Sequence, residues 1–105
     1  MGVGPIPAVQ NLLKNTGLSI SDFDVIESNE AFAAQAIAVN RGLDLDPKVV
    51  NPNGGAIALG HPVGATGAII TLKALYQLEI INGKRALITM CIGGGQGIAL
   101  AIERI

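Results

Sequence analysis

Residues 85–104 read RALITMCIGGGQGIALAIER, two apolar segments joined by a cluster of glycines. In the second segment Ile98, Leu100 and Ile102 alternate with small alanines, a pattern typical of a half-buried strand. The first segment is a longer apolar strand candidate that ends in Cys91 and Ile92. The stretch therefore predicts a strand over residues 85–92, a turn over 93–96 and a second strand over 97–104, paired as a hairpin.

The residues before this hairpin alternate between helix-like and strand-like segments. Predicted helices run from Pro7 to a stop at Gly17, over residues 31–40, and from residue 65 or 66 to 78. Short strands are predicted at residues 24–27 and 48–51, and a long glycine-rich loop follows over 51–64. Alternation of this kind predicts an α/β fold in which helices on both faces cover a mainly parallel, mixed sheet. We expect one domain over residues 1–105.

Composition excludes several classes of function. Of 105 residues, 50% are hydrophobic and 14% are charged, and the net charge of −1 offers no basic surface for nucleic acid or an anionic membrane. One cysteine and one histidine exclude a disulfide framework and a thiolate metal site. No apolar run is long enough to suggest a membrane span, and we expect a cytoplasmic location. The mean hydropathy of +0.50 predicts more apolar surface than so small a chain can bury alone.

His61 and Cys91 are the candidate catalytic residues. Each has an ordinary structural explanation, because a loop histidine can hydrogen-bond its own backbone and a strand cysteine can be a buried, unreactive thiol. Both, however, lie where strands meet glycine-rich loops, the usual position of sites in parallel α/β sheets. Glycines at 93–95 let backbone N–H groups approach a ligand closely. A thiol, an imidazole and exposed amides together can move protons and stabilise an oxyanion.

Two further patterns have competing explanations. Asn29 and Glu30 begin a predicted helix, where a cap and a first-turn acid would account for them equally well. The glycines of residues 93–97 superficially resemble a dinucleotide-binding turn. A strand rather than a helix follows them, and their spacing differs from G-x-G-x-x-G, so a dinucleotide site is excluded.

Three segments taken together resemble the signature blocks of the thiolase, or acetyl-CoA acetyltransferase, family. These segments are NEAFA at residues 29–33, GGAIALGHP at 54–62 with GATG at 64–67, and CIGGGQG at 91–97. They occur in the family's order, and the resemblance covers essentially the whole chain. It implies the C-terminal half of a thiolase-like fold and Claisen chemistry on 3-ketoacyl-CoA thioesters, with coenzyme A thioesters as substrates and no separate cofactor or metal.

The resemblance also implies a role for each matching residue. Cys91 is the acid or base that acts on the α-carbon of a thioester or on the leaving group. His61 activates a nucleophilic cysteine and helps to hold a thioester oxygen, and Asn29 anchors an ordered water at that oxyanion site. Gly93 offers its backbone N–H to the acyl oxygen, and Phe32 lines the channel for the pantetheine chain.

The sequence also departs from the family pattern. The acylated cysteine of thiolases lies in their N-terminal half, and the single cysteine here belongs to the later block. The family's first strand of this half would precede Met1. We expect that strand to be central, between the strands at residues 24–27 and 85–92. Its absence would leave a gap that closes only if the helices repack and that, left open, would expose Val25, Ile26, Leu87 and Ile88.

The leading hypothesis is the C-terminal catalytic portion of a thiolase-type acyl-CoA C-acyltransferase, inactive without the half that bears the nucleophile. Its expected partners are an acyl-CoA or CoA substrate and either an N-terminal thiolase half or another copy of the chain, within a homo-oligomer. The alternative is a non-catalytic binding or assembly module of thiolase fold. A condensing enzyme of the ketoacyl synthase type is a third possibility, against which the CIGGG block at Cys91 argues.

Overall fold

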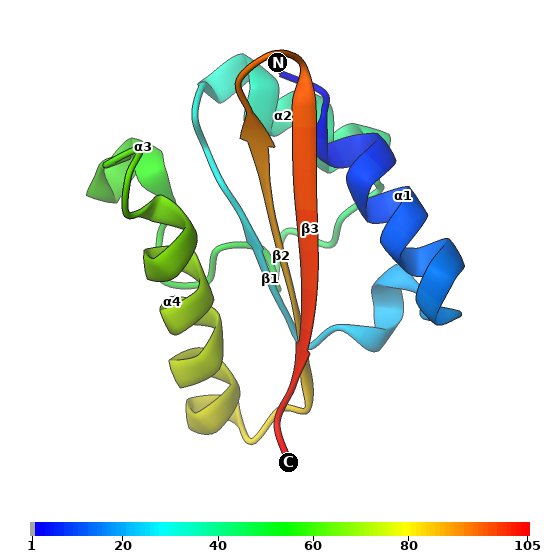
Figure 1. The fold of residues 1–105 in the computed structure, drawn as a ribbon. Helices are drawn as coiled ribbons and strands as arrows, with labels where there is room; N and C mark the ends of the chain where they lie inside the picture. The colour runs from blue at the N-terminus through cyan, green and yellow to red at the C-terminus, as the bar shows by residue number, and fades with distance from the viewer. Residues whose placement is uncertain (1) are drawn as a thin grey trace.

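The fold is built around one small mixed sheet. The structure, a computed structural model, describes residues 2–105. Its elements in chain order are α1 (Pro5–Thr16), a 3-10 turn (Ile20–Asp22), β1 (Val25–Ser28), α2 (Ala33–Gly42), α3 (Ala56–Leu59), α4 (Thr66–Ile81), β2 (Arg85–Ile92) and β3 (Gln96–Glu103). Helix α4 lies on one face of the sheet and α1 with α2 on the other (Figure 1). The predicted α/β architecture with helices on both faces is confirmed.

The strand order of the sheet is β1-β2-β3. β1 runs parallel to β2, from the pair Val25–Ala86 to the pair Ser28–Thr89, and β3 returns antiparallel to β2 through a tight turn. On the far side of β1, Val50 forms a single parallel bridge to Ile26. The strand predicted at residues 48–51 is thus reduced to one bridge, whereas the hairpin predicted over residues 85–104 is present.

The expectation of a gap between β1 and β2 is wrong. The two strands are hydrogen-bonded directly to each other, with no position for another strand between them. Helix α4 packs against both β1 and β2, so the crossover that it forms returns the chain beside the strand that it left. The four side chains expected to be exposed by the gap are all buried: Val25, Ile26, Leu87 and Ile88.

Two apolar clusters, one on each face of the sheet, hold the helices in place. Alternation along β1 directs Ile26 toward Val9 of α1 and Val39 of α2, and directs Val25 toward α4. The α4 side chains that meet the sheet are spaced four residues apart, at Ile70, Ala74 and Leu78, and so lie on one face of the helix.

Helix ends follow local signals. Pro5 begins α1, and Gly17 ends it in a left-handed conformation with φ of 72°, its N–H bonding the Leu13 carbonyl. The structure starts α2 two residues later than predicted and extends α4 three residues further, to a left-handed Asn82. The short helix α3 inside the glycine-rich loop was not predicted, because four residues are too few to show a helical period.

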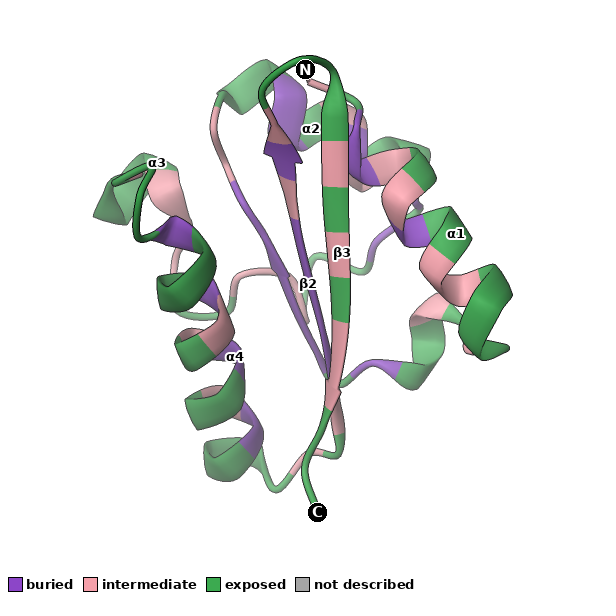
Figure 2. Ribbon diagram, in the orientation of Figure 1, coloured by how far each residue is buried: buried purple, intermediate pink, exposed green. Residues whose placement is uncertain are grey.

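The outward face of α4 is exposed (Figure 2), and several of its exposed side chains are large and apolar. We name this surface the α4 stripe, formed by Ile69, Leu72, Leu75, Tyr76 and Ile80. It agrees with the expectation that a chain of this hydropathy carries more apolar surface than it can bury alone. Within residues 2–105, no helix is both long and apolar enough to cross a membrane.

Candidate active site

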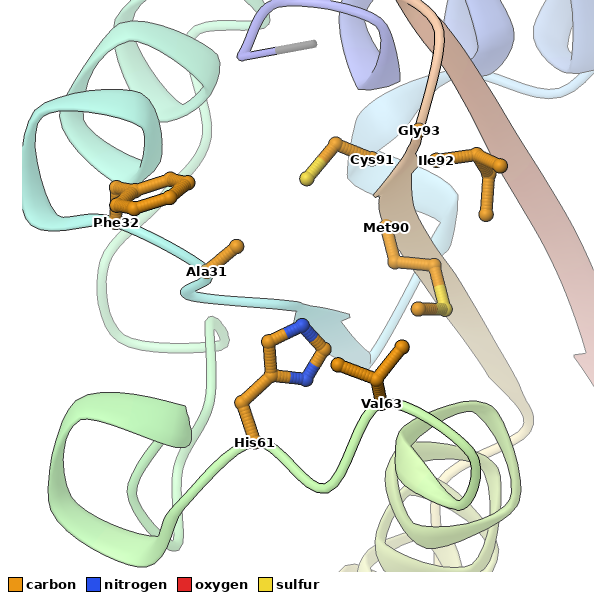
Figure 3. Close-up of a pocket in the computed structure, with 8 residues that line it drawn as sticks. All are labelled: Ala31, Phe32, His61, Val63, Met90, Cys91, Ile92 and Gly93. Atoms are coloured by element: carbon orange, nitrogen blue, oxygen red, sulfur yellow. The ribbon is translucent and has the colours of Figure 1, made fainter.

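The candidate site lies at one edge of the sheet, where β1 and β2 both end. Because these two strands are parallel, the loops that follow them meet at the same edge. A pocket of about 420 Å³ opens there. Its lining residues are Ala31, Phe32, His61, Val63, Met90, Cys91, Ile92 and Gly93 (Figure 3). Four of the five residues predicted for the site, namely Phe32, His61, Cys91 and Gly93, therefore border one pocket.

Cys91 occupies the penultimate position of β2. Its thiol is free, its side chain is 8% exposed, and its sulfur points into the open space, whereas Ile92 is directed away from that space (Figure 3). The turn that follows is made by Gly94 and Gly95 at φ of 84° and 82°, which favour glycine. No atom outside its chain neighbours lies within 4 Å of the Cβ position of Gly93, so the backbone there is unobstructed.

His61 enters the pocket from the glycine-rich loop. Helix α3 ends at Gly60, whose φ of 102° turns the chain, and His61 follows just before α4. In Figure 3 the imidazole ring points toward the same space as the Cys91 sulfur. Cys91 and His61 thus border the same space, one from the end of β2 and the other from the glycine-rich loop.

The hydrogen bonds around the His61 ring favour the tautomer with the proton on Nδ1. The Thr66 hydroxyl donates to the Pro62 carbonyl at 3.0 Å, so its oxygen accepts from His61 Nδ1–H at 2.6 Å. The Asn29 amide Nδ2 lies 3.5 Å from His61 Nε2 and donates to its lone pair. With the proton on Nδ1, Nε2 carries the lone pair, and its contact with Asn29 is at the outer limit of a hydrogen bond, so this nitrogen can take a proton from a reacting group.

Asn29 follows β1 directly and is buried beside the histidine. Its backbone N–H donates to the Thr89 carbonyl at 3.0 Å, which extends the β1–β2 pairing by one residue. The side chain is 3% exposed, and its Oδ1 has no hydrogen-bond partner within residues 2–105. Asn29 lines a second, much smaller cavity of about 20 Å³ rather than the main pocket. The predicted Asn29 and His61 are thus brought together, although Asn29 is not among the residues that line the main pocket.

Two side chains fasten the glycine-rich loop to the end of β1. The Asn51 side chain accepts from the Ser28 N–H at 2.9 Å and donates to the Ser28 carbonyl at 2.8 Å, as a neighbouring strand would. Glu30 Oε1 accepts the Ile57 N–H at 3.2 Å. A Cβ on Gly55 would lie 2.0 Å from that same carboxylate oxygen, so a larger residue there would require the Glu30 side chain to move.

The apolar wall of the pocket was missed from sequence. Met90 and Val63 line it together with Ala31, and Phe32, whose side chain is 58% exposed, lies at its open side. Thr66 was also missed, although a hydroxyl five residues after a candidate histidine, at the start of a helix, is a signal that could have been used. Among residues 2–105 no group of three or more His, Cys, Asp or Glu side chains could hold a metal ion.

Comparison with known proteins identifies the relatives of this chain. Residues 1–104 match the family described as "Thiolase, C-terminal domain". The chain is 64% identical to beta-ketothiolase BktB of Cupriavidus necator over 105 residues, which cover the whole chain and 27% of that protein. It is 55% identical over 104 residues to acetyl-CoA acetyltransferase of Paracoccus denitrificans, covering 99% of this chain and 27% of that protein.

The crystal structure of human mitochondrial 3-ketoacyl-CoA thiolase in complex with CoA superposes with a TM-score of 0.96 at 53% identity, covering 99% of this chain and 26% of that one. The chain thus spans about a quarter of the length of the relatives that it matches. A family match over nearly every residue, joined to so close a superposition, shows that this chain belongs to the thiolase family, in which it corresponds to the C-terminal domain.

Proposed function

We propose that this chain supplies the proton-transfer side of the active site of a thiolase-type acyl-CoA C-acyltransferase. The observation that carries the proposal is the pocket that His61 and Cys91 share at the strand ends, beside the unobstructed backbone of Gly93. Carbon–carbon bond cleavage next to a thioester needs an acid that protonates the departing carbon. It also needs a base that takes the proton of the nucleophile and later returns it. A thiol and an Nε2-unprotonated imidazole match these two tasks.

The chemistry is written here in the cleavage direction. A cysteine thiol from the other half of the enzyme adds to the 3-keto carbon, and His61 Nε2 takes the thiol proton. The C2–C3 bond then breaks, C2 takes the proton of the Cys91 thiol, and acetyl-CoA leaves. The Cys91 thiolate next takes the proton of the CoA thiol, which attacks the acyl-enzyme, and the departing cysteine recovers its proton from His61. Condensation is the reverse.

Asn29 and Phe32 have supporting roles in this proposal. Asn29 Oδ1 is buried without a protein partner within residues 2–105, which is the situation in which a buried amide binds an ordered water. That water, held beside His61, would help to stabilise the thioester oxyanion. The Gly93 N–H would donate a hydrogen bond to the acyl oxygen. The exposed Phe32 ring at the open side of the pocket would contact the pantetheine chain of coenzyme A.

The nucleophile must come from elsewhere, because the single cysteine of the sequence is Cys91. We propose that the partner is an N-terminal thiolase half, which covers the α4 stripe. This apolar surface lies on the helix that follows His61, and its first member, Ile69, also lines the small cavity beside Asn29. A homo-oligomeric assembly and a cytoplasmic location of the complete enzyme stay predictions from the sequence.

A chimera tests the function. Residues 1–105 replace the aligned segment of Cupriavidus necator beta-ketothiolase BktB, to which they are 64% identical. The assay follows the loss of acetoacetyl-CoA absorbance during thiolysis by CoA. We expect the chimera to turn over and the 105-residue chain alone to be inactive. His61→Ala and Cys91→Ala should each lower kcat of the chimera by roughly 10²–10⁴-fold, the usual contribution of a general acid or base.

Lys14→Met provides the matched control, because Lys14 is exposed on α1 and makes no ion pair among residues 2–105. A folded chimera whose turnover does not depend on His61 or Cys91 would contradict the proposed roles. A folded chimera without any turnover would instead favour the alternative, a thiolase-fold module that binds or assembles without catalysing.

A further inference from the structure

Lys73 connects β1 to the glycine-rich loop from the inner side of α4. Its Nζ lies 2.9 Å from Glu27 Oε1 and also donates to the carbonyl of Gly54. The Glu27 side chain is 2% exposed and the Lys73 side chain is 21% exposed, so a buried carboxylate is paired with a partly exposed ammonium group. One ammonium group therefore joins three segments that are far apart in the sequence: a strand, a loop and a helix.

The stability of the fold does not explain this pair. Taking two charges out of water costs several kcal/mol per ion, and apolar side chains of similar volume often serve the fold as well or better. Burial raises the pKa of the Glu27 carboxyl, and the Lys73 ammonium acts in the opposite direction, while a more distant Glu30 adds to the rise. Glu27 Oε2 has no hydrogen-bond partner within residues 2–105. A buried ion pair that adds little to stability points instead to a role in fixing the position of the segments that it joins.

The geometry concerned is that of the candidate site. Glu27 and Asn29 are two residues apart at the end of β1, so their side chains project from the same face, and Lys73 and Asn29 line the same small cavity. On the loop side, Gly54 immediately precedes the segment that carries α3, Gly60 and then His61. The distance from Asn29 Nδ2 to His61 Nε2 is 3.5 Å, at the outer limit of a hydrogen bond. A small separation of the strand from the loop would therefore break it.

We propose that Lys73 and Glu27 are positioning residues that hold the glycine-rich loop against β1 and so set the contact between Asn29 and His61. This inference rests on the proposed function for its catalytic consequence. Neither side chain lines the main pocket, so both act through Asn29 and His61 and touch no reacting atom.

Two measurements test the positioning role, and one of them does not depend on activity. His61 is the sole histidine of the sequence, so the ¹⁵N chemical shifts of its ring in the 105-residue chain report its tautomer and hydrogen bonding without ambiguity. In Lys73→Met we expect the Nε2 shift to move and the two tautomers to mix. In the chimera, the same variant should lower kcat about tenfold with KM changed by less than about twofold, the result expected when a group is misplaced rather than lost.

Two further variants separate position from charge burial. Lys73→Met/Glu27→Gln also removes the carboxylate that Lys73→Met leaves unpaired, so this double variant should regain stability toward urea. It should not regain kcat or the original ring shifts, because the Gly54 carbonyl still lacks the hydrogen bond from Lys73. Lys73→Arg keeps a cation that can reach both partners and should restore most of each signal.

The outcomes are distinct. Original ring shifts and original kcat in Lys73→Met, relative to the Lys14→Met control, would overturn the proposal. Recovery of the ring shifts and of kcat in Lys73→Met/Glu27→Gln would also overturn it. If Lys73→Met alone fails to fold, this double variant is the one that tests the positioning role. An inactive parent chimera would contradict the proposed function, whereas the ring shifts would still decide whether Lys73 positions His61.

Discussion

Gly97→Ala should be among the most damaging single methyl additions in this chain. Gly97 pairs with Cys91 across the β2–β3 hairpin, and α1 begins directly against it. A Cβ on Gly97 would lie 2.2 Å from both the carbonyl carbon and oxygen of Gly4, and 2.6 Å from the nitrogen of Pro5. Ordinary contact requires about 3.5 Å, so α1 and β3 would have to separate by more than about 1 Å.

The size of the effect follows from what the methyl group meets. Overpacking costs about 1–3 kcal/mol when neighbouring side chains can yield, and here the neighbour of Gly97 is the backbone of Gly4. We therefore expect a loss near the upper end, about 3 kcal/mol, out of the ~5–15 kcal/mol typical of a domain. At ~4–8 °C per kcal/mol for a chain of this size, Tm should fall by roughly 12–24 °C.

The assay is urea and thermal unfolding of the 105-residue chain, followed by circular dichroism. Gly64→Ala is the matched control, because nothing lies within 4 Å of its added Cβ and its φ is not in the left-handed region. It should change the free energy of unfolding by less than about 0.5 kcal/mol. If Gly97→Ala were as mild as Gly64→Ala, the backbone contact between α1 and β3 would not be the tight one described here.

Two other changes have clear expected outcomes. Thr66→Val removes the hydroxyl that accepts from His61 Nδ1–H, so in the chimera kcat should fall about tenfold while Thr66→Ser retains it, and equal rates for both variants would contradict the assigned tautomer. The pKa of Asp24 is lowered because its carboxylate accepts the backbone N–H groups of Lys84 and then Arg85. Its contribution to stability is therefore complete above the unfolded value near 4 and is lost as pH falls through the lower folded value. Urea unfolding at a series of pH values should show a flatter acid limb in Asp24→Asn, and an unchanged limb would assign the acid sensitivity to other groups.

Local patterns in the sequence predicted much of the secondary structure. The alternation at Ile98, Leu100 and Ile102 located β3, because a strand that buries one face repeats every two residues. Gly17 marked the end of α1, since a left-handed residue there favours glycine. His61 and Cys91 were selected by the same means, as chemistry-bearing side chains next to glycine-rich turns at strand ends, whereas the roles of Asn29, Gly93 and Phe32 came from the resemblance to the thiolase family.

What periodicity could not provide was the identity of neighbours. The apolar pattern of residues 24–27 and 85–92 indicates burial but not which strand lies alongside, and the expected gap between them proved wrong. The pairing of Glu27 with Lys73 and of His61 with Thr66 and Asn29 likewise depends on where α4 and the loop are placed. Patterns along a chain indicate which residues are buried. Hydrogen-bond and ion-pair partners depend instead on distances in space, and these are set only when the sheet and its helices have packed together.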